Sequence, residues 1–228
     1  MSSIRRFPRL VVATVAAMLL GLTLSTSTAV AEPSPTLEPE VPSFVDVPET
    51  HSFYEHITLI ASWGLVKGFA DDTFRPNSPV TRGQLAVIAY KYLGEPEFTP
   101  PEESPFSDMT PEHTFYKHVT WLAATEVVNG YEDGTFRPNG KLSRGQLASI
   151  LFNLIGPGSG DGEYTAPEES PFEDVDEDFI FYPHIAWLEE TGIVNGYGDG
   201  TFRPDAALTR GQTAVIIVKV DRFLNPPT

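Results

Sequence analysis

The hydrophobic pattern of this chain repeats three times, and each copy contains two stretches with the period of a helix. In the first stretch, apolar residues lie three and four positions apart, as on one face of an amphipathic helix of about three turns. These residues are Ile57, Ile60 and Ala61 in the first copy, Val119, Leu122 and Ala123 in the second, and Ile185 and Leu188 in the third. The pattern predicts one short helix near the start of each copy.

The second helical stretch lies at the end of each copy, with apolar residues at i, i+3, i+4 and i+7. They are Leu85, Ile88, Ala89 and Tyr92 in the first copy, and Leu147, Ile150, Leu151 and Leu154 in the second. The third copy keeps Ile216, Ile217 and Val220 but begins with Thr213. Because its residues 214–218 are apolar on all sides, we expect this helix to be the most deeply buried of the set.

Glycine-containing loops connect the two helices of each copy. Gly64 and Gly192 lie where a first helix can end in a left-handed residue, whereas the second copy has Glu126 there, a poorer stop. The loops read "GFADDTFRP", "GYEDGTFRP" and "GYGDGTFRP", which is turn chemistry. We interpret their aspartates as turn residues rather than calcium ligands, because the alternating carboxylates and closing Glu of an EF-hand loop are missing.

The copies align without gaps as residues 44–93, 106–155 and 172–224. The linkers 94–105 and 156–171 are rich in Pro, Gly and Glu and lack apolar periodicity, so we expect tethers. Residues 32–43 have the same character and predict an extended leader. The pattern therefore predicts a mainly α fold of three helix-loop-helix repeats.

The first 31 residues have the features of a secretory signal peptide. Three arginines precede an apolar run from Leu10 to Leu24, and small residues end in Ala29-Val30-Ala31, where we expect cleavage. The apolar run is short for a membrane span, which needs roughly 20 residues, although an uncleaved anchor is the alternative. We predict a secreted chain with no transmembrane span in its mature part.

The charge of the chain limits its partners. Its formal charge is −16, and removing Arg5, Arg6 and Arg9 with the signal peptide makes it −19. Such a surface exerts no long-range attraction on nucleic acid or anionic membranes, and we expect neither as a partner. The chain has no cysteine, which excludes disulfides, thiolate metal sites and a cysteine nucleophile.

One phrase opens the second helix of every copy: "VTRGQLAVIA" from Val80, "LSRGQLASIL" from Leu142 and "LTRGQTAVII" from Leu208. A hydroxyl residue followed three positions later by Gln is a capping box, in which each side chain bonds the other residue's backbone amide. The pairs are Thr81 with Gln84, Ser143 with Gln146, and Thr209 with Gln212. Helix formation therefore accounts for these six residues.

The capping box does not explain the arginine of the phrase, which is Arg82, Arg144 or Arg210. A cation at the first helical position is opposed by the helix dipole, so we expect a partner, either a carboxylate of a neighbouring copy or an external anion. The following Gly83, Gly145 and Gly211 allow close approach to the backbone. A cation beside exposed helix amides is a workable seat for an acid group, and from physical chemistry alone both partners stay open.

Other repeated residues have simpler interpretations. We expect His56, His118 and His184 to be packed helix residues rather than metal ligands, since no second ligand accompanies them. Arg75, Arg137 and Arg203 are expected to stack on rings or pair with nearby aspartates. Trp121 and Trp187, with Leu59 at the same place in the first copy, are expected to pack in the core or between copies.

No asymmetric catalytic constellation occurs in the sequence. Every candidate polar residue is triplicated or lies in a linker, as Glu102-Glu103 and Glu168-Glu169 do in two "PEESP" segments. We therefore expect no enzyme activity, no catalytic residue, no metal and no cofactor.

Taken together, the pattern F-x-D…F-Y-x-x-I…G-Y-x-D-G-T-F-R-P…[ST]-R-G-Q resembles the S-layer homology (SLH) repeat over residues 44–224. The resemblance implies a pseudo-threefold arrangement of the repeats around a central three-helix bundle. It also implies grooves between repeats that hold an acidic, often pyruvylated, secondary cell-wall polysaccharide at the surface of a bacterium.

The resemblance also implies ligand-binding residues. They are Arg82, Arg144 and Arg210 for the acid group, Asp46, Asp108 and Asp174, the loop glycines Gly68, Gly130 and Gly196, and Tyr54, Tyr116 and Tyr182 where the family commonly has Trp. The chain also has Gly-Gln where the common motif has Ala-Glu. The predicted function is a non-catalytic anchor that binds cell-wall polysaccharide. The alternative is an envelope scaffold or protein-interaction module whose motif arginines form salt bridges between repeats.

Overall fold

The computed structural model describes residues 42–159 and 163–226, so the predicted signal peptide lies outside the described residues. Six α-helices and one 3-10 turn occur in this part of the chain, without a strand. They are α1 (Tyr54–Ser62), α2 (Arg82–Tyr92), α3 (Tyr116–Ala124), α4 (Arg144–Ile155), η1 (Pro157–Ser159), α5 (Tyr182–Glu190) and α6 (Arg210–Leu224). The prediction of a mainly α fold is confirmed. None of these helices is long and apolar enough to cross a membrane.

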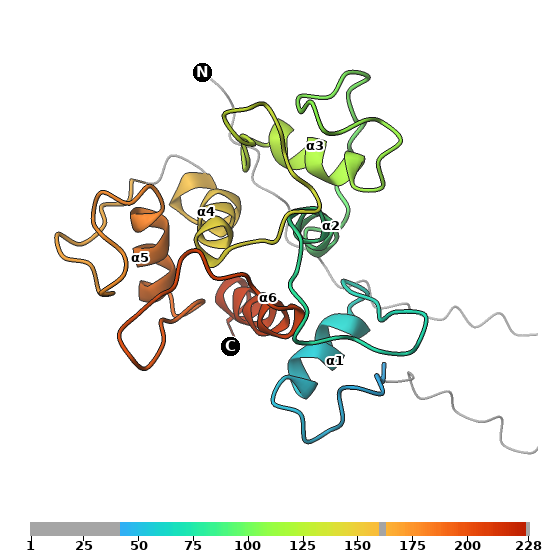
Figure 1. Cartoon of the computed structure of the whole chain (residues 1–228), viewed down its shortest axis with the longest axis horizontal. Coiled ribbons are helices and arrows are strands. Elements are labelled where there is room, and N and C mark those ends of the chain that lie inside the picture. Colours follow the sequence, from blue (N-terminus) through green and yellow to red (C-terminus); the bar gives the residue numbers. More distant parts are fainter. Residues whose placement is uncertain (1–41, 160–162, 227–228) are drawn as a thin grey trace, which may run out of the picture. The chain divides into compact units, whose positions relative to one another are not determined.

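The helices form two concentric groups, with α2, α4 and α6 at the centre and α1, α3 and α5 outside them (Figure 1). Each outer helix packs against the central helix of the preceding copy: α3 on α2, and α5 on α4. The pair α1 and α6 closes the circle. The threefold arrangement predicted from the resemblance is therefore confirmed, and each packed unit joins two copies.

Three backbone hydrogen bonds close a cycle just before the central helices. Val80 N–H donates to Leu208 O at 2.9 Å, Leu208 N–H to Leu142 O at 2.9 Å, and Leu142 N–H to Val80 O at 3.0 Å. All three side chains are buried. Because each copy donates to one neighbour and accepts from the other, this hub holds the three copies together.

The capping box forms at all three central helices. Gln84 N–H donates to Thr81 Oγ1 and Thr81 N–H donates to Gln84 Oε1, and the same pairs form between Ser143 and Gln146 and between Thr209 and Gln212. The next two amides are also bonded, since Arg82 N–H donates to Gly140 O and Gly83 N–H to Pro138 O. The second and third helices repeat this arrangement. Our expectation of exposed helix amides is therefore wrong, because the loop of a neighbouring copy covers them.

The glycine of the phrase faces an aromatic ring of another copy. A Cβ added to Gly83 would overlap the ring of Phe115, and one added to Gly211 would overlap the ring of Phe53. At Gly145 the added atom would lie 2.9 Å from Phe181. The close approach that the glycine allows is thus made by the protein itself, at each junction between copies.

The linkers are more than tethers. Tyr90 Oη donates to Pro96 O at 2.6 Å, Tyr116 Oη to Pro101 O at 2.9 Å, and Tyr182 Oη to Pro167 O at 2.7 Å. Phe98 and Tyr164 pack against the hydrophobic core. The described linker residues follow the core because tyrosine hydroxyls bind their carbonyl groups, which the apolar periodicity could not indicate.

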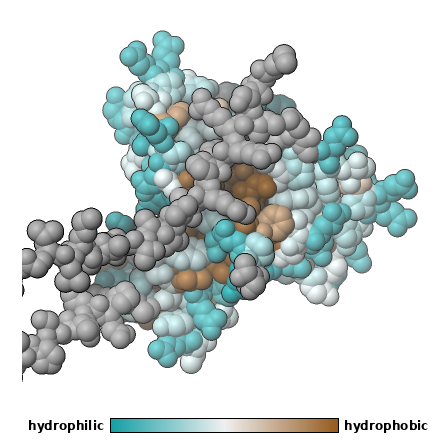
Figure 2. Space-filling view, turned by 180° about the vertical axis from the view of Figure 1, so that it is seen from behind, coloured by the Kyte–Doolittle hydropathy of each residue, from teal (hydrophilic) through white to brown (hydrophobic). Residues whose placement is uncertain are grey.

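The expectation that α6 is the most buried central helix is wrong. Seven of its 15 residues are buried, compared with seven of 11 in α2. Its last turn ends in exposed Phe223 and Leu224. Seen from behind, the described part has apolar surface near its centre and hydrophilic surface around it (Figure 2).

Candidate functional site

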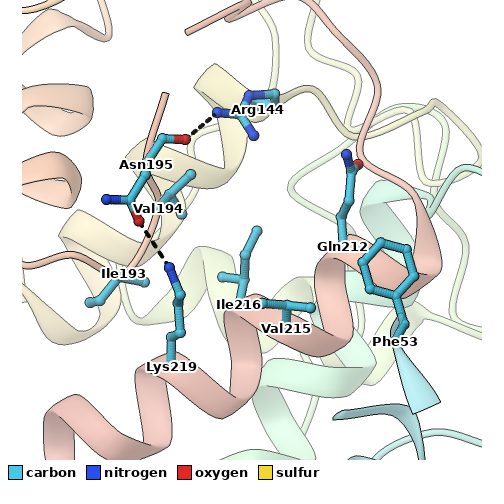
Figure 3. A pocket seen from close by; sticks show the side chains of 9 residues that line it. All are labelled: Phe53, Arg144, Ile193, Val194, Asn195, Gln212, Val215, Ile216 and Lys219. Atoms are coloured by element: carbon cyan, nitrogen blue, oxygen red, sulfur yellow. Dashed lines mark hydrogen bonds between the residues drawn. The ribbon is translucent and has the colours of Figure 1, made fainter. Parts of the chain in front are cut away.

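A groove of about 200 Å³ lies beside α6 and is lined by all three copies. Phe53 comes from the first copy, Arg144 from the second, and the segment 193–195 and four α6 residues from the third. Figure 3 shows these side chains around the groove, with Arg144 and Lys219 reaching toward Asn195 from two different helices. The α6 residues are Gln212, Val215, Ile216 and Lys219.

Asn195 accepts hydrogen bonds from two cationic side chains at this groove. Its backbone carbonyl accepts a hydrogen bond from Arg144 Nη2 at 3.0 Å, and its side-chain oxygen accepts one from Lys219 Nζ at 2.9 Å. Lys219 also donates to Gly192 O at 3.1 Å, at the end of α5. Two positive charges are therefore bound to the same asparagine in a protein whose formal charge is −16.

Arg144 is held by backbone and rings instead of by a carboxylate. Its Nε donates to Phe202 O at 2.7 Å, and its guanidinium lies 4.3 Å from the centroid of the Phe202 ring and 4.9 Å from that of Tyr197. The residue is 7% exposed, and burial lowers its pKa. Because a buried cation normally has a counter-ion, the absence of an ion pair for Arg144 among the described residues is a feature to explain.

The other two motif arginines have equivalent contacts. Arg82 Nε donates to Phe136 O at 2.8 Å, and Arg210 Nε donates to Phe74 O at 2.7 Å. Burial lowers the pKa of both. The alternative of inter-repeat salt bridges is therefore wrong about the partner: these arginines do connect copies, but through carbonyl oxygens and aromatic rings.

The repeated aspartates of the opening motif explain why no such salt bridge forms among the described residues. Asp46 accepts hydrogen bonds from Phe74 N–H and Arg75 N–H, both at 2.7 Å. Asp108 and Asp174 accept the same pair of bonds in their copies. Both oxygens of each carboxylate thus hold the loop of their own copy.

The loop arginines have the partners that we expected. Arg75, Arg137 and Arg203 form ion pairs with Asp71, Asp133 and Asp199, and they stack on Phe69, Tyr131 and Tyr197. Hydrogen bonds from the neighbouring Thr side chain and then from the Arg lower the pKa of each of these aspartates to about 2. The prediction of stacking and pairing is confirmed, and the aspartates serve as turn residues.

The remaining residues implied by the resemblance also have structural contacts. Tyr116 and Tyr182 are each 4% exposed and hold linkers, whereas Tyr54 is partly exposed. A Cβ at Gly68 would lie 2.6 Å from the ring of Phe44, and Gly130 and Gly196 are equally close to Phe106 and Phe172. Ligand contacts of these residues and of the three aspartates stay a prediction, since packing alone accounts for where they lie.

The packing assigned to the repeated His and Trp residues is confirmed, whereas the same expectation for Leu59 is wrong, because this residue is 36% exposed. The rings of His118 and Trp121 meet Tyr90 edge-on at 5.2 and 5.3 Å, and Trp187 meets Phe152 at 5.7 Å, in each case across two copies. Among the described residues, no group of three or more His, Asp or Glu side chains is arranged to hold a metal ion.

The sequence predictions missed Asn195 and Lys219, which complete the groove. The available signal was the alignment of the copies, because Lys219 corresponds to Lys91 and Asn153 in the second helices. The residue at this position changes between Lys and Asn among the copies, so it is not part of the repeated motif.

The described residues thus form an interlocked module of three helical repeats with a cationic groove. The sequence model of the S-layer homology domain matches residues 43–86, 105–148 and 171–214. The chain therefore belongs to the S-layer homology family, as the repeated motif predicted.

Curated relatives share this part of their sequence. The "Cellulosome-anchoring protein" of Acetivibrio thermocellus is 27% identical over 174 residues, which are 75% of this chain and 37% of that protein. The "S-layer protein sap" of Bacillus anthracis is 28% identical over 183 residues, 79% of this chain and 21% of that protein. The chain thus spans well under half the length of these relatives. Family and relatives together indicate a secreted protein of the bacterial cell surface.

Proposed function

We propose that this protein is a non-catalytic component of the cell envelope that binds an acidic secondary cell-wall polysaccharide in the grooves between its repeats. Binding would anchor the protein itself, or a protein partner that it carries, to the cell surface. Membership of the S-layer homology family and the names of the relatives support this role.

The observation that carries the proposal is the pair of cations at Asn195. Arg144 is buried without a carboxylate partner among the described residues, and Lys219 lies on the other side of the same asparagine. A carboxylate of the ligand supplies the counter-ion that Arg144 lacks, and charge-assisted hydrogen bonds are about twice as strong as neutral ones. A pyruvate ketal places such a carboxylate on a sugar, which agrees with the ligand class that the resemblance implies.

The site works at short range. A formal charge of −16 repels an anionic polymer at a distance, so attraction must come from cations that the polymer touches. Several grooves on one module that bind one long polymer also gain affinity together through their high effective concentration.

Co-sedimentation with isolated cell walls tests the proposal. We expect the protein to sediment with intact walls and to stay in solution after mild acid has removed the acid-labile polymer. Equal sedimentation with treated and untreated walls would contradict polysaccharide binding and would favour a protein partner or the scaffold role.

A matched pair of variants assigns the binding to the groove. Lys219→Gln removes a groove cation, and Lys141→Gln removes the same charge from an exposed loop position that does not line the groove. We expect about a tenfold loss of wall affinity for Lys219→Gln and little change for Lys141→Gln. Equal losses in the two variants would show that the groove has no special role.

A further inference from the structure

The residues around the groove beside α6 have counterparts in the other two copies, and these counterparts differ in charge. The position of Lys219 is Lys91 in the first copy and Asn153 in the second. The position of Asn195 is Lys67 in the first copy and Asn129 in the second. We name the three sites the first, middle and third grooves, after the copy that supplies the central helix.

The side chain from the central helix has the same place in all three grooves. Lys91 Nζ donates to Gly64 O at 2.9 Å, Lys219 Nζ to Gly192 O at 3.1 Å, and Asn153 Nδ2 to Val127 O at 3.2 Å. Each bond reaches the backbone just beyond an outer helix. The geometry is therefore kept in the middle groove, whereas the positive charge is lost.

The motif arginines differ as well. Arg144 and Arg210 each have a second hydrogen bond, from Nη2 to the backbone carbonyl of Asn195 at 3.0 Å and of Lys67 at 3.2 Å. Arg82 has one hydrogen bond from its side chain to the described residues, through Nε. The guanidinium of the middle groove is thus fixed at fewer points, and a less preorganised group binds a ligand more weakly.

The residue directly before the backbone that Asn153 contacts differs as well. Glu126 takes the place of Gly64 and Gly192 there, and its side chain is exposed. The first groove therefore has the cations Arg210 and Lys91, and the third has Arg144 and Lys219. The middle groove has Arg82, with Asn129 and Asn153 at the positions of Lys67 and Lys91.

We propose that the acidic polymer binds in the first and third grooves, and that the middle groove is a structural joint that binds no acid group. Lys91 and Lys219 then determine which grooves bind. This inference rests on the proposed function, because it assigns the sites at which the same ligand is held.

Site-resolved binding by ¹⁵N NMR tests this assignment on the mature chain. The probe is a methyl hexopyranoside with a 4,6-linked pyruvate ketal, and the control is the same glycoside without the ketal. We expect the amide signals of Lys67 and Asn195 to shift with the acidic probe, and the signal of Asn129 to stay unchanged at probe concentrations that saturate the other two.

Single substitutions assign each site. Lys91→Gln should weaken the first groove about tenfold and leave the third unchanged, and Lys219→Gln should do the reverse. Asn153→Gln, which changes no charge at the equivalent position, should alter neither. The triple variant Glu126→Gly, Asn129→Lys, Asn153→Lys should create binding in the middle groove.

The outcomes separate this inference from the proposed function. Equal binding at all three grooves, or a loss caused by Asn153→Gln, would overturn the selective use of the grooves and leave polysaccharide binding intact. If the unaltered protein bound neither this probe nor cell walls, the proposed function would fail, and the assignment of grooves would fail with it.

Discussion

The three copies are alike at the hub of this protein and differ in its grooves, although the same helices build both regions. At the hub, the three copies have the same contacts: the closed cycle of Val80, Leu142 and Leu208, the capping boxes, and the glycines against phenylalanine rings. In the grooves, equivalent positions differ between Lys, Asn and Glu. The contacts that are the same in all copies thus hold the threefold arrangement together. The residues that differ among the copies lie in the grooves, where the three sites can differ in binding.

The motif arginine belongs to both regions. Its Nε bonds a carbonyl of the next copy in all three cases, and in the third copy's groove the Arg144 guanidinium also lines the open surface. Of the two partners that the sequence left open, a carboxylate of a neighbouring copy forms no ion pair with these arginines among the described residues, and an external anion stays a proposal. The internal bonds to carbonyl oxygens fix the cation in place.

Substitution of the glycine that packs on a phenylalanine ring should destabilise the protein most. Gly83→Ala or Gly211→Ala would gain up to about 1 kcal/mol in helix propensity, but the added Cβ overlaps a phenylalanine ring, and overpacking costs about 1–3 kcal/mol or more. We expect a net loss of about 2 kcal/mol in the free energy of unfolding by urea. Gly198→Ala is the control, because nothing lies within 4 Å of its added Cβ. Stabilisation of Gly83→Ala would show that the ring does not hold this junction.

Removing the motif arginine should lower the stability of the protein by a similar amount. Arg144→Ala loses the bonds to Phe202 O and Asn195 O, and hydrogen bonds to charged groups contribute about 1.5–3 kcal/mol. We expect the unfolding free energy to fall by about 2 kcal/mol, with Arg144→Lys intermediate because Lys lacks the planar fork. An unchanged urea midpoint for Arg144→Ala would mean that Arg144 serves only the groove.

Acidic pH should lower the stability of the folded protein through the repeated histidines. Burial is the main cause that lowers the pKa of His56, His118 and His184 from 6.5, and their Nδ1 atoms have no hydrogen-bond partner among the described residues. The unfolded chain therefore takes up protons first, and stability falls as the pH decreases below 6.5. The contribution of Asp71, Asp133 and Asp199 is lost only below pH 3.8, toward their pKa of about 2.

Urea unfolding at pH 7.5, 6.5 and 5.5 measures the histidine effect separately from the aspartates. His184→Phe, which keeps a ring against Phe152, should reduce the loss of stability between pH 6.5 and 5.5. A stability that stays constant or rises over this range would contradict the account of the buried imidazoles.

The smallest predicted effect concerns the end of α3. Glu126 has φ of 60°, in the left-handed region where the other copies have Gly64 and Gly192. Glu126→Gly should stabilise the protein by about 1 kcal/mol, and Gly192→Glu should destabilise it by a similar amount. The thermal midpoints of the two variants give the signs directly, and a loss of stability in Glu126→Gly would show that the carboxylate has a structural contact.

The sequence allowed the helices, capping boxes and threefold arrangement to be predicted because their signals are local or come from the repeated motif. It could not show that each outer helix packs on the preceding copy, since periodicity identifies an apolar face and not its partner. Nor could it assign Gly83 to Phe115, which is distant in the sequence and meets it only through the packing of α3 on α2. Lys219 was missed because only the fold brings it to Arg144, through Asn195.

The central claim is that repeated residues build the frame and that the lysines of two grooves bind the wall. The most direct test measures, for the double variant Lys91→Gln, Lys219→Gln, both the binding isotherm on isolated walls and the thermal midpoint. We predict an affinity loss of about 100-fold with a midpoint within about 2 °C of the unaltered protein. Retained wall binding, or a loss accompanied by unfolding, would contradict the claim.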